Sequence, residues 1–165
     1  MPAVNRRARR LRSTGGFLCL VVLLCGAPAA RAASPGQEEA PREAGLQQME
    51  ILISIGFQKG DVDRLATAFS RRVKTYVACA PLAADDGYYG ADQMRLLLRR
   101  MFRGKETVDF LILEPAARPR PDGLAVISAL WTYRDPTAHS ARVRLSFALA
   151  PEDGSWRVRE IRELK

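Results

Sequence analysis

Cysteine and histidine are scarce in this chain. Its 165 residues include three cysteines and one histidine, and Cys19 and Cys25 lie in an apolar N-terminal segment that we expect to be removed. Because Cys79 would then be the one cysteine that remains, no intramolecular disulfide can form. One cysteine and one histidine, His139, cannot supply the usual ligand shell of a transition metal. The sequence therefore predicts neither a metal site nor a cofactor.

Acidic residues are missing from residues 1–32. This segment has a basic stretch at 6–12, an apolar stretch at 17–24 and the residues Ala-Arg-Ala at 30–32, which are the three parts of a secretory signal peptide. The apolar stretch is too short to cross a bilayer comfortably. We expect a signal peptide over 1–32 and a mature chain that begins near Ala33 without a stable membrane span. Export to the bacterial envelope, periplasmic or secreted, follows from this pattern.

The excess of positive charge is concentrated in the same segment. The chain has 26 Lys and Arg against 18 Asp and Glu, but six of the basic residues and none of the acidic ones lie in residues 1–32. The mature part therefore carries a net charge of only +2. Neutralising the phosphates of a nucleic acid needs a strongly basic surface, so we expect no nucleic-acid partner.

The mature chain reads as a short spacer followed by one domain. Residues 33–42 are polar and contain two prolines, so they cannot bury enough apolar area to offset their ordering entropy. We expect them to form a flexible spacer, and residues 43–165 to form a single domain. Apolar residues recur at helical spacing from Met49 to Phe57, which predicts an amphipathic helix that Gly60 ends.

Two more helices are predicted after Gly60. Asp61 is placed to cap a short helix, and although Asp61 and Asp63 resemble an acid pair, a cap and a first-turn charge explain them more simply. A third helix starts near residue 90 and carries arginines at 95, 99 and 103 on one face. Such a face could contact anionic lipid or a polyanion, but an ordinary solvated face has the same pattern.

The hydrophobic period changes from helical to two after residue 104. Four strands of an antiparallel meander are predicted at 108–113, 124–133, 142–149 and 156–159, with a weaker strand at 72–77 and a loop at 80–87. Ile161 is out of phase with Trp156 and Val158, so we expect a β-bulge near Glu160 that returns Ile161 to the core. The strand at 124–133 is apolar on both faces, which predicts that a second copy of the chain covers its outer face in a homodimer.

This order of elements resembles the nuclear-transport-factor-2-like cone, a cystatin-like α+β fold with N-terminal helices packed on a curved antiparallel sheet. From about residue 42 to 164 the chain is similar to a family of exported bacterial domains of unknown function. The matching motifs are Gly60-Asp61 with Leu65 and Phe69, Tyr89 to Gln93, Leu98 to Phe102, and Arg142-Val143. Departures are Glu114-Pro115-Ala116 in place of His-x-Gly, and Ser128 in place of glycine.

The resemblance leaves function open, because the wider superfamily contains ketosteroid-isomerase-like and dehydratase-like enzymes as well as non-catalytic modules. No residue stands out as a catalytic group. A ligand in the cone would meet aromatic rings, and Glu114 is the strand carboxylate that shares the face of Phe110. The candidate ligand-binding residues are therefore Tyr76, Tyr89, Phe110, Glu114 and Trp131, although the aromatic ones could equally fill the core.

The sequence thus favours an exported, non-catalytic domain that binds a small apolar ligand or a protein partner in the cell envelope. A pocket enzyme with isomerase- or dehydratase-like acid–base chemistry in the same cone is the alternative. An open cavity that holds a carboxylate near a tyrosine hydroxyl would favour the enzyme. A cone filled by Met, Leu and Phe side chains would favour the binding domain.

Overall fold

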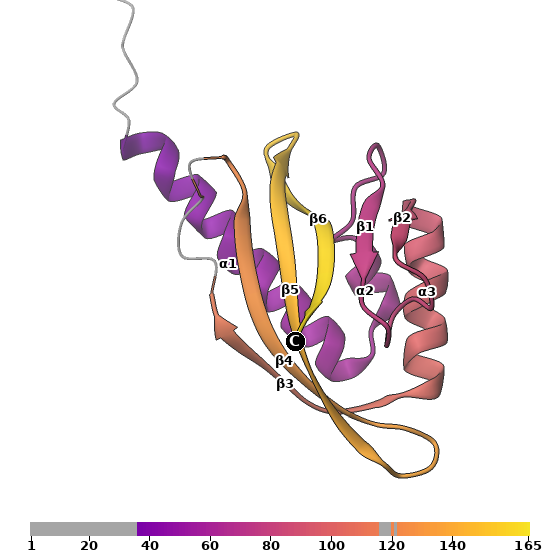
Figure 1. The fold of residues 1–165 in the computed structure, drawn as a ribbon. Coiled ribbons are helices and arrows are strands. Elements are labelled where there is room, and N and C mark those ends of the chain that lie inside the picture. The colour runs from indigo at the N-terminus through magenta and orange to yellow at the C-terminus, as the bar shows by residue number, and fades with distance from the viewer. Residues whose placement is uncertain (1–35, 116–119, 121) are drawn as a thin grey trace, which may run out of the picture. The chain divides into compact units, whose positions relative to one another are not determined.

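A computed structural model describes residues 36–115, 120 and 122–165 (Figure 1). All of them belong to one structural unit, Ala33–Lys165. The predicted signal peptide lies outside the described residues. Within the described part of the chain, no helix has the length and apolar character that a bilayer crossing requires.

Three helices precede most of the sheet: α1 (Gly36–Lys59), α2 (Val62–Ala66) and α3 (Ala91–Gly104). The helix α1 starts inside the segment that we expected to be a flexible spacer, so the backbone of residues 36–42 differs from that expectation. Glutamine, glutamate and alanine at 37–40 are good helix formers, and acidic residues are favoured near a helix N-terminus. These preferences outweigh the polarity of the segment.

A tight turn joins α1 to α2. Gly60 has a φ of 61°, a left-handed conformation that glycine adopts without strain. Asp61 then caps α2, as predicted: its Oδ1 accepts a hydrogen bond of 2.9 Å from the backbone N–H of Arg64, and this bond lowers the pKa of the carboxyl group. Asp63 pairs instead with Arg95 of α3 at 3.4 Å. The two aspartates therefore have structural roles.

The sheet has six strands in the order β2-β1-β6-β5-β4-β3. They are β1 (Thr75–Ala78), β2 (Gly87–Tyr89), β3 (Glu106–Glu114), β4 (Ala125–Arg134), β5 (Ser140–Glu152) and β6 (Ser155–Leu164). The predicted meander β3 to β6 is confirmed, but the sheet is mixed and not wholly antiparallel, because β1 pairs with β6 in parallel. Parallel neighbours need a crossover connection, and here the chain between β1 and β6 includes β2, α3 and the strands β3 to β5.

The predicted bulge lies in β6. Glu160 pairs with Ala148 and Val158 pairs with Leu149, so Arg159 is the extra residue of β6. Trp156, Val158 and Ile161 are all buried as a result. The register shift thus explains how an out-of-phase isoleucine reaches the core.

The core lies between the helices and one face of the sheet, which we call the inner face; α1 crosses it against β3 and β6 (Figure 1). Strand β4 turns Ile127, Ala129 and Trp131 inward, where each is fully buried. Of the core residues that the sequence predicted, Phe102 is only half-buried. The others are buried: Leu98, Phe110, Val143, Leu145, Phe147 and Trp156.

Candidate functional site

Aromatic rings fill the space beneath the inner face of the sheet. Phe57 of α1 stacks on Phe110 with ring centroids 4.6 Å apart and meets Trp131 and Phe147 edge-on at 5.5 and 5.9 Å. Phe102 of α3 closes the group at 5.7 Å from Phe57. We call these five residues the interior aromatic cluster. Because its rings are in van der Waals contact, the centre of the cone is occupied by the protein's own side chains.

The indole nitrogen of Trp131, a polar atom of the interior aromatic cluster, already has a hydrogen-bond partner. The indole N–H of Trp131 donates a hydrogen bond of 3.0 Å to the hydroxyl of Thr107 on the neighbouring strand β3. The Trp131 side chain is fully buried, so an unbonded N–H there would be costly. The pairing with Thr107 therefore fixes Trp131 as a structural residue of the core.

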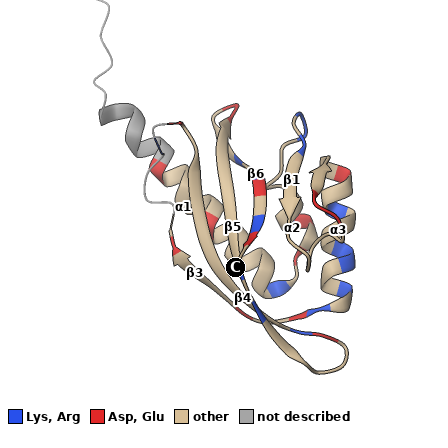
Figure 2. Cartoon of the chain, in the orientation of Figure 1, with Lys and Arg blue, Asp and Glu red and all other residues tan. Residues whose placement is uncertain are grey.

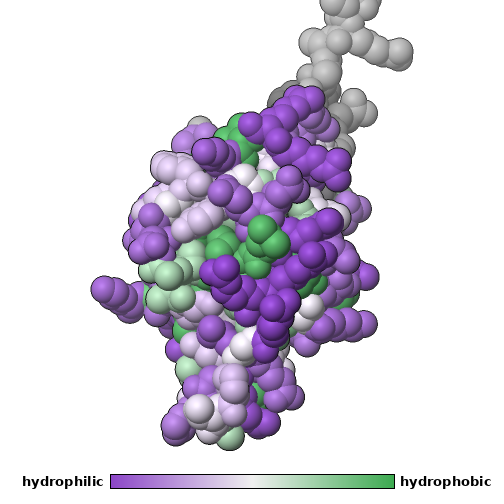
Figure 3. Space-filling model, turned by 90° about the vertical axis from the view of Figure 1, so that its right-hand side faces the viewer, coloured by the Kyte–Doolittle hydropathy of each residue, from purple (hydrophilic) through white to green (hydrophobic). Residues whose placement is uncertain are grey.

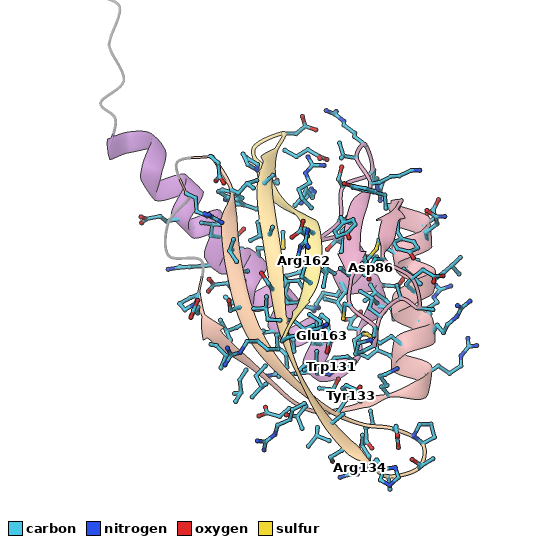
Figure 4. The ribbon with its side chains drawn as sticks, in the orientation of Figure 1. Asp86, Trp131, Tyr133, Arg134, Arg162 and Glu163 are labelled. Carbon is cyan, nitrogen blue, oxygen red and sulfur yellow. The ribbon has the colours of Figure 1, made fainter. Side chains whose placement is uncertain are left out.

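Polar side chains gather where the inner face opens to solvent, at a place we call the mouth. Tyr133 follows Trp131 on the same face of β4, with the two rings 4.4 Å apart, and Glu163 of β6 is exposed (Figure 4). The Nζ of Lys105 lies 5.6 Å from the ring centroid of Tyr133. Burial raises the pKa of the Tyr133 phenol, and the nearby charge of Glu163 raises it further. Tyr133 is therefore a neutral hydrogen-bond donor at neutral pH.

Cys79 lies at the end of β1 beside the mouth. Its side chain is 2% exposed, and burial raises the pKa of the thiol from 9.0 to about 11. The thiolate is the reactive form of cysteine. At neutral pH Cys79 is thus a small core residue and not a nucleophile.

An open groove of about 770 Å³ borders the mouth, between the C-terminal ends of α1 and α3 and the hairpin that joins β4 to β5. Its carboxylates are engaged. Glu106 pairs with Arg134 at 3.5 Å, and Asp135 accepts hydrogen bonds from the hydroxyl of Thr137 and from the backbone N–H of His139. The hydrogen bond from the Thr137 hydroxyl lowers the pKa of Asp135 most, and the bonds from the backbone N–H groups of His139 and Thr137 lower it further. The groove therefore offers a surface for contact and no free acid–base pair.

The five predicted ligand-binding residues do not form one site. Phe110 and Trp131 belong to the interior aromatic cluster, whereas Tyr76 faces outward, with its ring 5.0 Å from the guanidinium carbon of Arg162. Tyr89 donates its hydroxyl to a backbone carbonyl at 2.7 Å, and Glu114 is exposed at the end of β3. The sequence did not indicate that Lys105 and Glu163 lie at the mouth. Lys105 follows the end of α3, and Glu163 lies beyond the bulge of β6, so no apolar periodicity assigns either residue to a face.

The opposite, outer face of the sheet exposes an apolar patch. Leu111 and Leu113 of β3 are 49% and 42% exposed, and Leu130 of β4 lies directly opposite Leu111. We call these three residues the outer leucine patch. Arg144 of β5 is paired with Leu130 and borders the patch.

Among the described residues, no group of His, Cys, Asp and Glu is arranged to hold a metal ion.

A family model described as a SnoaL-like domain matches residues 51–161, and no curated protein matches the chain. Solved structures are similar in fold. A DUF4783 family protein from Bacteroides fragilis YCH46 is 13% identical over 67% of this chain and 92% of its own, with a TM-score of 0.53. A ketosteroid isomerase-like protein from Erwinia carotovora atroseptica SCRI1043 is 13% identical over 75% and 97%, with a TM-score of 0.56.

A third structure is named for an association domain. It is described as a calcium/calmodulin-dependent protein kinase II association domain from Xanthomonas campestris, and it is 16% identical over 80% of this chain and 91% of its own, with a TM-score of 0.52. At these identities the likeness concerns the fold alone. The three neighbours confirm the expected nuclear-transport-factor-2-like architecture.

Proposed function

Because the chain belongs to the SnoaL-like domain family, we propose that it is an exported, non-catalytic member that binds a protein partner on the outer face of its sheet. The interior aromatic cluster carries this proposal. Four ring contacts converge on Phe57, between 4.6 and 5.9 Å, so a small apolar ligand would have to displace core side chains to enter the cone. Binding at an outer surface has no such cost.

The partner that fits best is a second copy of the chain. Exposed leucines on a sheet face, here near the β3 edge of the sheet, lose unfavourable contact with water when another apolar face covers them. The outer leucine patch is such a face, and a two-fold dimer would bring one patch onto the other. The name of the Xanthomonas neighbour, an association domain, agrees with this role. Arg144 borders the patch and would have to remain at the rim, in water or beside a carboxylate.

Analytical ultracentrifugation of the protein purified without its signal peptide tests this proposal. We expect twice the chain mass for the wild type and the single chain mass for Leu111→Arg. Leu96 on α3 provides a matched control, since it is 62% exposed and Leu96→Arg makes the same chemical change away from the sheet. A monomeric wild type, or equal dissociation by both variants, would contradict association through the outer leucine patch.

Export is part of the proposal and is supported by the basic, apolar and small-residue order of residues 1–32. It places the association in the cell envelope. The charge of the mature chain, close to balanced, is compatible with contact between copies.

The mouth supports one second candidate, a pocket enzyme. Tyr133 is a neutral donor, and the carboxylate of Glu163 is close enough to raise the pKa of its phenol, which is the kind of pair that isomerases use. A β,γ-unsaturated ketone whose isomerisation is followed by absorbance provides the test. Turnover that is lost in both Tyr133→Phe and Glu163→Gln would favour the enzyme, whereas the filled cone predicts no turnover.

A further inference from the structure

Two adjoining hollows lie on the side of the domain that carries α3, which Figure 3 shows as largely hydrophilic around a small hydrophobic area. One hollow has a volume of about 350 Å³ and the other about 590 Å³. Both are lined by Ala66, Arg71 and Arg95, so the two hollows share a wall and lie side by side. We call the pair the arginine groove.

Arginines from three separate parts of the chain converge on this groove. Arg71 and Arg72 come from the segment that leads into β1, Arg95 from α3 and Arg157 from β6. Figure 2 shows basic residues both on α3 and on the segment before β1. The planar guanidinium group presents several N–H donors in a geometry that matches the oxygens of a phosphate.

The carboxylates of the groove are mostly engaged. Asp153 pairs with Arg72 at 3.0 Å, and Glu152 pairs with Arg159 at 2.7 Å behind the groove. Among the described residues, Arg71 and Arg157 form no ion pair. Glu152 also acts electrostatically on Arg157, whose Nη1 donates a hydrogen bond of 3.0 Å to the backbone carbonyl of Trp156. The lining still contains four arginines against three carboxylates, Glu152, Asp153 and Asp92, so it keeps an excess of positive charge.

Arg95 is also available to a ligand. Its ion pair with Asp63 is 3.4 Å long, and the two side chains are 45% and 75% exposed. An exposed pair of this kind contributes little, so Arg95 can turn toward an anion at small cost.

The end of α3 adds to the positive field. Gly90, the N-cap, has no side chain to accept hydrogen bonds from the first turn, and the N-terminus of a helix carries about half a positive charge. Asp92 in that turn offsets part of the field. The arginines therefore provide most of the attraction, and the helix end lies at one side of the groove.

We propose that the arginine groove binds an anion that bears a phosphate group. This site is distinct from the outer leucine patch and does not depend on the proposed function. A soluble phosphate compound and a phospholipid headgroup share the chemistry that the guanidinium groups would recognise.

Isothermal titration with inorganic pyrophosphate and sedimentation with phosphatidylglycerol vesicles distinguish the two sources. We compare the wild type with Arg71→Ala, with Arg157→Ala and with the matched control Arg99→Ala. Arg99 is exposed on α3 and does not line the groove. Since a charge-assisted hydrogen bond contributes enough free energy for about a tenfold change in affinity, each groove variant should weaken binding about tenfold and the control should leave it unchanged.

Each result has a defined meaning. Pyrophosphate binding that falls in both groove variants supports a site for soluble phosphate compounds. Vesicle binding that falls in the same way, while phosphatidylcholine vesicles bind none of the proteins, supports a headgroup site. No binding of either probe, or an equal loss in Arg99→Ala, overturns the proposal, and unchanged thermal unfolding of the variants shows that their folds are intact.

Discussion

Replacing Phe57 with alanine probes the filled cone directly. Phe57 is 3% exposed, and its ring contacts those of Phe102, Phe110, Trp131 and Phe147. Truncating a buried phenylalanine costs about 3–5 kcal/mol, because apolar contact is lost and a cavity remains. For a unit of this size that loss corresponds to a fall of about 10–20 °C in Tm.

The cavity left by Phe57→Ala offers a second readout. A dry apolar cavity of the size of a ring binds small aromatic molecules, so toluene should raise the Tm of the variant by mass action. The wild type should show no such rise, because the ring of Phe57 occupies the space. Phe102→Ala is the matched control: Phe102 belongs to the same cluster but is only half-buried, so its truncation should cost less and leave no closed cavity.

Two results would contradict a core filled and held together by these rings. If toluene stabilises the wild type as much as Phe57→Ala, the cone already contains an open cavity. If Phe57→Ala unfolds at the same denaturant concentration as the wild type, the ring contacts do not hold the core together.

Three further predictions concern other parts of the chain. N-terminal analysis of protein recovered from the envelope should give a first residue near Ala33, and an intact Met1 on a cytoplasmic protein would contradict export. The Cys79 thiol has a folded pKa of about 11 against 9.0, so the unfolded chain loses this proton first. The free energy of unfolding should therefore fall as pH rises from 9 to 11, by up to about 3 kcal/mol. Denaturant titrations of Cys79→Ala should lack this slope, and an equal slope would disprove the assignment. A Cβ at Gly56 would lie 2.5 Å from the Cγ of Leu65, so Gly56→Ala should destabilise the protein by about 1–3 kcal/mol in thermal unfolding. In the double variant with Leu65→Ala, the loss of stability should be smaller than the sum of the two single losses.

Much of the fold could be predicted because its signals are local. The Asp61 cap depends on one side chain and the next three residues, and the bulge near Glu160 follows from the phase of apolar residues within one strand. The parallel pairing of β1 with β6 could not be predicted in this way. It joins residues about eighty positions apart, and no periodicity within either strand encodes its neighbour.

The candidate site was less predictable for a related reason. Alternation placed Phe110 on the inner face, but it left open which face of its strand Trp131 occupies. It also could not say whether a ligand or another ring would cover these side chains. Phe57 of α1 covers both rings. This contact arises only when α1 packs on the sheet, and no local sequence pattern indicates it. The side chain of Tyr76 faces outward because Tyr76 of β1 pairs with Glu160 of β6. The sequence does not indicate this register.

The protein's own side chains fill the cone, and we propose that partners bind on the outer face. The most direct test is the ¹⁵N–¹H NMR spectrum of the labelled protein recorded over a range of protein concentrations. We predict that the backbone signals of Leu111, Leu113 and Leu130 shift as concentration rises, while the indole N–H signal of Trp131 keeps its position and exchanges slowly with solvent. Fast exchange of that indole proton, or a spectrum that does not change with concentration while the rotational correlation time is that of a single chain, would contradict the claim.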